Sequence, residues 1–142
     1  MQLILVWLAV TTWYIPTDFS DPVLLYGGHS PTPECRWVAV DVYRLLDGDV
    51  ELGDVLYIEF VDHPQVSTVL AVRDTGPLGD YYIEDFPELP IVLDIPYRAW
   101  PAGLEGLRSA RVRIVNITAL DRAAAVGDAA SMVPIYVPQE WR

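Results

Sequence analysis

The stretch Ala71-Val72-Arg73-Asp74-Thr75-Gly76-Pro77 decides how this chain folds, because an apolar strand ends there in a carboxylate and a tight Gly-Pro break. Two further stretches, Val38-Ala39-Val40-Asp41 and Ile91-Val92-Leu93-Asp94, also close a short apolar run with an aspartate. Each of these aspartates is therefore expected where a buried strand reaches the surface. A strand end holds a carboxylate rigidly, and apolar neighbours can raise its pKa toward that of a working general acid.

The composition predicts an all-β domain. The chain has 142 residues, enough for one domain with a core of its own, and 52% of them are apolar. Twelve prolines and nine glycines interrupt the apolar residues regularly. That pattern is typical of many short strands joined by tight turns. We expect a small closed six-stranded barrel with one or two short helices.

The charge and the rare residue types exclude several function classes. Twenty acids against nine arginines, with no lysine, give a formal net charge of −11. Such a surface repels phosphates, so no nucleic-acid partner is expected. Cys35 is the only cysteine, and His29 and His63 lie far apart in the sequence. We therefore expect no internal disulfide, no metal site and no cofactor.

The first ten residues are apolar except for Gln2, but they do not match a standard signal peptide. No basic residues precede the apolar run, and no small-x-small cleavage site follows it. The run is also too short to span a bilayer, so we interpret it as the start of a strand over residues 3–15. An extracellular, cell-wall-associated or virion location is favoured, with export by another route.

The remaining elements follow from apolar periodicity. A long loop is expected over residues 16–35 and one helical turn within residues 97–107. The barrel is assigned to residues 1–117, and residues 118–142 form a C-terminal extension with a short helix near Asp121 and an apolar extended tail. This tail is expected to pack on its own barrel or on a neighbouring subunit. Further strands are predicted at residues 37–43, Val55–Phe60, 67–73, 91–93 and 110–117.

The order of these elements resembles the three-aspartate domain and the barrel of rare lipoprotein A. Ala39-Val40-Asp41 is followed by the turn Leu52-Gly53-Asp54 and an apolar strand, then by residues 71–76 and by Leu93-Asp94. Asp74-Thr75-Gly76-Pro77-Leu78 resembles the Asp-Arg-Gly-Pro-Phe run of rare lipoprotein A. The resemblance covers residues 11 to 117 and implies a double-psi β-barrel, a fold whose members include lytic transglycosylases and expansins.

The resemblance also implies a role in binding or cleaving peptidoglycan by metal-independent acid/base catalysis. Asp94 matches the general acid/base of membrane-bound lytic transglycosylase A, and Asp74 matches the second aspartate beside it. Asp41 falls where rare lipoprotein A carries a histidine. We expect Asp74 and Asp94 on adjacent strand ends, close enough to contact one sugar. The candidate substrate-binding residues are Thr12, Tyr14, Thr75, Tyr81, Tyr82 and Trp100, although aromatic residues in so apolar a chain are more often part of the core.

A non-catalytic interpretation stays open. Aspartates at strand ends also cap turns and accept backbone N–H groups. Residues 80–88 form a dense acidic and aromatic stretch that departs from the family pattern. The alternative is an assembly module of a secreted or virus-like particle, which forms a homo-oligomer through the N-terminal strand and the C-terminal tail. Asp74-Thr75-Gly76 also occurs in aspartic proteases, but Arg73 stands where those enzymes carry an apolar residue.

Overall fold

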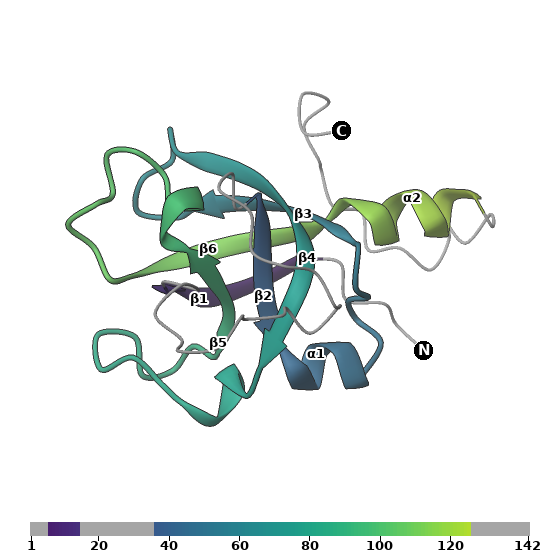
Figure 1. Ribbon diagram of the computed structural model, residues 1–142, viewed down its shortest axis with the longest axis horizontal. Coiled ribbons are helices and arrows are strands. Elements are labelled where there is room, and N and C mark those ends of the chain that lie inside the picture. Colours follow the sequence, from purple (N-terminus) through teal and green to yellow (C-terminus); the bar gives the residue numbers. More distant parts are fainter. Residues whose placement is uncertain (1–5, 15–35, 126–142) are drawn as a thin grey trace, which may run out of the picture.

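The structure, a computed structural model, describes residues 6–14 and 36–125 (Figure 1). Three sequence predictions fall on other residues and lie outside the described part. They concern the first residues of the N-terminal strand, the long loop with His29 and Cys35, and the apolar tail after residue 125.

Six strands form a ring (Figure 1). Their order is β1-β5-β2-β4-β3-β6, and β6 pairs back onto β1. The pairing is uneven, since β1 and β6 pair along most of their length whereas β5 and β2 meet only at Ala39–Asp94 and Val40–Leu93. The prediction of an all-β chain with six strands is confirmed. The strands are β1 (Val6–Tyr14), β2 (Trp37–Asp41), β3 (Val55–Phe60), β4 (Ser67–Gly76), β5 (Ile91–Pro96) and β6 (Ser109–Asn116).

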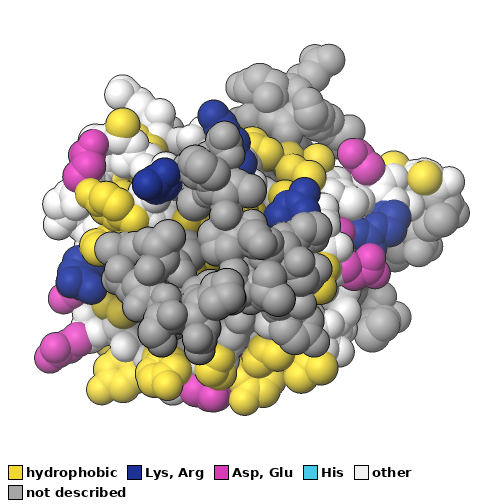
Figure 2. Space-filling model, in the orientation of Figure 1, with side chains coloured by type: hydrophobic (Ala, Val, Ile, Leu, Met, Phe, Trp, Pro, Cys, Tyr) yellow, Lys and Arg dark blue, Asp and Glu magenta, His cyan; other side chains and the backbone are white. Residues whose placement is uncertain are grey.

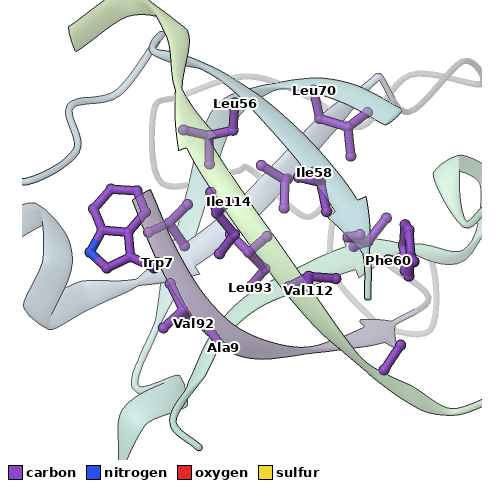
Figure 3. Close-up of a cluster of buried hydrophobic side chains, with 14 of the residues drawn as sticks. Trp7, Ala9, Leu56, Ile58, Phe60, Leu70, Val92, Leu93, Val112 and Ile114 are labelled. Atoms are coloured by element: carbon purple, nitrogen blue, oxygen red, sulfur yellow. The ribbon is translucent and has the colours of Figure 1, made fainter. Parts of the chain in front are cut away.

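Apolar side chains fill the interior of this ring. Figure 3 shows side chains from β1, β3, β5 and β6 meeting there, among them Ala9, Ile58, Leu93 and Ile114, all fully buried. Burial of each large side chain contributes about 1.5–3 kcal/mol to folding before the cost of ordering it. The core therefore holds the strands in register, and a site built on their outer face rests on a rigid support.

The strand bounds agree with the sequence at β3 and differ elsewhere. β4 extends to Gly76 and β5 to Pro96, beyond the apolar runs that predicted them. β2 ends at Asp41 instead of residue 43, because the helix α1 (Val42–Leu46) begins at once. A helix of five residues is too short to leave a periodic apolar signal in the sequence. For that reason it was not predicted.

Helix α2 (Ile117–Ala125) begins four residues before the predicted Asp121. The side-chain Oδ1 of Asn116 accepts a hydrogen bond from the backbone N–H of Ala119 at 3.0 Å, which caps the helix at its N-terminus. Ala119, Leu120 and Ala123 form its buried face. The division of the chain after residue 117 stays a prediction. None of the helices among the described residues has the length and apolarity needed to cross a membrane.

Two 3-10 turns lie among the described residues. η2 (Leu78–Asp80) follows β4, and η3 (Tyr97–Ala99) follows β5. The second of these lies within residues 97–107, where one helical turn was predicted. η2 packs against β5, β2 and α1, so it lies beside the strand ends that carry the aspartates.

Candidate functional site

Asp74 reaches the outer face of the barrel through an irregularity in β4. Val38 of β2 is paired with Val72, but the next residue, Ala39, is paired with Asp74, so the register passes over Arg73. Side chains alternate between the two faces of a strand, and one extra residue moves all later side chains to the opposite face. Because Val72 points into the core, this shift turns Asp74 outward.

Asp94 is turned outward by a second shift of the same kind. The register of β1 against β5 passes over Val92, so that Asp94 lies opposite Thr12 of β1. On its other side Asp94 lies opposite Ala39 of β2. Leu93, the residue before it, is fully buried in the core. The two shifts therefore place both aspartates on the outer face of the ring.

Ala39 is the common neighbour of the two aspartates. It is paired with Asp74 on one side and with Asp94 on the other, so β2 lies between the two strands that carry them. The expectation that the two aspartates lie on adjacent strands is therefore wrong. Two strand spacings separate their Cα atoms by about 10 Å. Ala39 has only a methyl group, which leaves the space above it to the two carboxylates.

The environment of Asp94 favours its protonated form. Burial raises the pKa of Asp94 to about 6, while the hydrogen bond from Thr12 lowers it and the charge of Asp74 raises it. The Thr12 hydroxyl donates to Asp94 Oδ1 at 2.9 Å. A carboxyl group with this pKa is partly protonated near neutral pH, so it can both give and take a proton.

Both carboxylate oxygens of Asp74 accept hydrogen bonds. The Tyr14 hydroxyl donates to Oδ2 at 3.0 Å, and the backbone N–H of Thr75 donates to Oδ1 at 2.9 Å. The Thr75 hydroxyl in turn donates to the backbone oxygen of Val40 at 2.8 Å, which ties β4 to β2. The structure thus brings Thr12, Tyr14 and Thr75 together with Asp74 and Asp94. The sequence had named all five.

Asp41 lies further along the same face of β2, but it is engaged by the backbone. It is 4% exposed, and its Oδ1 accepts a hydrogen bond from the N–H of Gly79 at 2.9 Å. A Cβ at Gly79 would stand 2.8 Å from Asp41 Oδ2, so only glycine fits this approach. In this arrangement Asp41 holds the η2 turn against β2.

The aromatic candidates divide into exposed and buried ones. Tyr81 and Tyr82 are 66% and 70% exposed. Trp100 is buried in the core, where its indole N–H donates to the Leu104 oxygen at 2.7 Å and its ring meets Phe60 edge-on. Trp100 is therefore a core residue and presents no surface to a sugar. Figure 2 shows hydrophobic side chains along the lower edge of the molecule, where Figure 1 places α1 and the segment between β4 and β5.

Sequence reasoning missed Trp37, which lies on the same face as Asp74 and Asp94. Its ring meets that of Tyr14 edge-on at 5.8 Å, and its buried indole N–H has no hydrogen-bond partner among the residues that the structure describes. Its position two residues before Ala39 was the available signal, because residues i and i+2 of a strand share a face. Among residues 6–14 and 36–125, no three His, Cys, Asp or Glu side chains are placed to hold a metal ion.

No family model and no curated protein matches this chain. Its fold is similar to that of an expansin from Clavibacter michiganensis in the apo state, with 17% identity and a TM-score of 0.55. A mutant of that expansin in complex with cellohexaose gives 15% identity and a TM-score of 0.56. Each comparison covers 79% of this chain and 50% of the expansin, so the chain spans about half of that protein. The ring of strands in this chain is thus similar in fold to part of those expansin structures.

Proposed function

We propose that this chain binds a cell-wall polysaccharide over the outer face that carries Thr12, Asp74 and Asp94, and that it cleaves the glycan with Asp94 as general acid. The observation that carries the proposal is the pKa of Asp94, raised to about 6 mainly by burial. Perturbed carboxyl groups of this kind concentrate at catalytic sites. The solved expansin complex with cellohexaose supports a polysaccharide as ligand, since its barrel is similar to this one.

The barrel itself is proposed to be of the double-psi type, related to rare lipoprotein A and the three-aspartate domain. Two parallel strand pairs, β1 with β5 and β2 with β4, lie in one small ring. Parallel neighbours need long crossover connections, and two of them in a six-stranded ring require connections that pass over one end. The similarity to expansin structures supports the same assignment.

In the proposed reaction, protonated Asp94 gives its proton to the glycosidic oxygen as the bond to the anomeric carbon breaks. The Asp94 carboxylate then takes the proton from the sugar's own 6-hydroxyl, while the hydroxyl oxygen closes a ring on the anomeric carbon. The Asp74 carboxylate, held by Tyr14 and Thr75, stabilises the positive charge of the transition state. A positioned acid/base of this kind accelerates a reaction by about 10²–10⁴.

The experiment is product analysis after incubation with peptidoglycan sacculi and with cellulose, without added metal. We expect soluble anhydro-sugar products from sacculi, a rate that depends on a group with a pKa near 6, and loss of at least 10²-fold in Asp94→Asn. Asp121→Asn is the control, because Asp121 is exposed on α2. Full activity of Asp94→Asn would contradict the assignment of the acid.

A second candidate is a non-catalytic assembly module. Leu8 of the N-terminal strand β1 is 53% exposed, an apolar side chain on a surface that a second subunit can cover. In this case no product forms from any glycan, and the chain self-associates. Light scattering of the protein and of Leu8→Glu distinguishes the two proposals, because only an assembly module dissociates when a charge is placed there.

A further inference from the structure

A cluster of two aromatic rings and one guanidinium lies at the end of β1, next to the aspartate site. We call it the Trp13 cluster; it consists of Trp13, Tyr97 and Arg108. The rings of Trp13 and Tyr97 are 4.6 Å apart, and the Arg108 guanidinium lies over the Trp13 ring at 5.0 Å. The Trp13 indole N–H donates to the Leu107 oxygen at 2.9 Å, which fixes the orientation of the ring.

Arg108 differs from four other arginines of the barrel, which are paired with carboxylates. Arg44, Arg111, Arg113 and Arg122 each form an ion pair with an aspartate or a glutamate. Arg108 is exposed, and no carboxylate of the described residues forms an ion pair with it. Arg111 also lies over a ring, that of Phe86, but it is paired with Asp62; of these two stacked arginines, Arg108 is the one without a carboxylate partner among the described residues.

When the flat face of a guanidinium stacks on an aromatic ring, its N–H donors still point outward in the plane of the guanidinium. These donors match both oxygens of a carboxylate at once. Tyr97, 38% exposed, adds a ring face against which an apolar face of a sugar can pack. The Trp13 cluster therefore combines the two elements that a site for an acidic sugar requires.

Strand register places the Trp13 cluster beside the proposed catalytic group. Thr12, which donates to Asp94, is paired with Ser109 of β6, the residue directly after Arg108. Tyr97 begins η3 directly after β5, the strand that carries Asp94. Two strand spacings separate β6 from β5 across β1, about 10 Å. In Figure 2, arginine side chains border hydrophobic ones at the left, where Figure 1 places the end of β1 and the start of β6.

We infer that the Trp13 cluster is a subsite for a carboxylate-bearing sugar of the glycan, with Arg108, which is stacked on the Trp13 ring, binding the carboxylate and the ring of Tyr97 packing on the sugar. The inference rests on the proposed polysaccharide binding. It names the chemical class of one sugar, an acidic one, at a fixed place relative to Asp94. One glycan chain spans both sites.

The test measures binding of two matched probes by calorimetry at about 150 mM salt, where the Debye length is about 8 Å and the repulsion from distant acids is screened. The probes are cellohexaose and cellohexaose oxidised at C6 to carboxylates. We expect the wild-type chain to bind the oxidised probe about tenfold more tightly, and Arg108→Gln to bind the two probes equally. Arg108→Lys keeps the charge but not the bidentate geometry, and it should retain only part of the preference.

Arg113→Gln is the matched control, because Arg113 lies on β6, the strand that begins directly after Arg108, is exposed and is bound to Glu59 at 2.8 Å. It removes the same charge and should keep the preference. An equal loss in both variants would overturn the subsite, since the effect would then be one of net charge alone. So would equal binding of the two probes by the wild-type chain.

The outcome also separates the subsite from the proposed catalysis. A preference for the oxidised probe that Arg108→Gln removes, together with no product from any glycan, supports the subsite and overturns cleavage. Product formation that depends on Asp94, without any preference between the probes, supports cleavage and overturns the subsite. Binding of neither probe overturns polysaccharide binding and the subsite together. Circular dichroism of Arg108→Gln verifies that the barrel is intact.

Discussion

Asp54 and Asp94 are both aspartates at the edge of the same core, and the structure treats them in opposite ways. Asp54 is 3% exposed and accepts three hydrogen bonds. The donors are the backbone N–H of Glu51 at 2.9 Å, the side-chain amide of Asn116 at 2.9 Å and the guanidinium of Arg122 at 2.5 Å. This network joins the turn before β3 to the end of β6 and to α2, and it engages both oxygens of the carboxylate.

Asp94 is partly buried, but fewer hydrogen bonds offset the cost of burying its charge. Among the described residues, the Thr12 hydroxyl is its hydrogen-bond donor, and no arginine contributes to the shift of its pKa. Burial without a cation disfavours the ionised form, which raises the pKa of Asp94 to about 6. The comparison teaches that burial of the side chain alone does not make a carboxylate reactive. What matters is how many donors the fold brings to it.

The largest expected effect on stability comes from removing the Asp54 carboxylate. Asp54→Ala removes one acceptor from the Arg122 guanidinium, which keeps Glu51, and one from the Asn116 amide, which keeps the Asp49 oxygen, while the Asn116 carbonyl must still cap α2. We expect the free energy of unfolding to fall by about 2–4 kcal/mol. Urea denaturation followed by circular dichroism measures it. Asp121→Ala on the exposed side of α2 is the control, and a loss below about 1 kcal/mol for Asp54→Ala would contradict a structural role for this network.

The next effect concerns Asp94 and the pH dependence of stability. Its pKa is about 6 in the folded chain and 3.8 in the reference state, so the folded chain holds this proton more tightly. The resulting stability is fully present below pH 3.8 and is lost as the pH rises through 6. Asn does not titrate. Relative to wild type, Asp94→Asn should therefore gain about 2–3 kcal/mol in the free energy of unfolding between pH 4 and pH 7.

Urea denaturation of both proteins at several pH values tests this expectation. A constant difference between the two proteins over this range would show that Asp94 titrates normally in the fold. In that case Asp94 would titrate like an ordinary surface aspartate, and its smaller number of hydrogen-bond donors would have no effect on its pKa.

A smaller effect tests whether Asp41 has a structural role, as Asp54 does, or is part of the candidate site, as Asp94 is. Gly79→Ala forces a Cβ to within 2.8 Å of Asp41 Oδ2, and we expect a loss of about 1–2 kcal/mol in the free energy of unfolding. In an Asp41→Ala background the clash disappears and the same substitution should be nearly neutral. An undiminished loss in that background would mean that Asp41 does not hold the η2 turn.

The smallest effect sharpens the description of Asp94. Thr12→Val removes the hydroxyl that donates to its Oδ1, and this hydrogen bond lowers the pKa of Asp94. The pKa should therefore rise above its wild-type value, by less than about one unit. Carbon-13 NMR of the aspartate carboxyl groups measures it. A fall in the pKa of Asp94 would mean that Thr12 disfavours the charged form.

Sequence reasoning located the strands where the apolar signal was strong. β3 was predicted at its observed bounds because Val55–Phe60 is an uninterrupted apolar and aromatic run between a Gly-Asp turn and Asp62-His63-Pro64. It did not find α1, and it placed the start of α2 too late. Asn116 directly before Ile117 was the available signal, since asparagine is a favoured N-cap residue.

The candidate site was found in part. The aspartates were recognised because each closes an apolar run, but Trp100 was counted with the site although it lies in the core. An exposed tyrosine and a buried tryptophan can follow the same kind of local sequence. Only the packing of Phe60 against Trp100 distinguishes the two environments.

The sequence by itself determined that the chain is all-β, that it is strongly acidic, and that three short apolar runs are each followed by an aspartate. These properties are local, since they depend on composition and on the period of two along a strand. Only the tertiary structure decided which carboxylates meet. The register passes over Arg73 and Val92, and these two shifts put Asp74 and Asp94 on one face of the barrel. Register depends on pairing between strands distant in the sequence, and no local pattern encodes it.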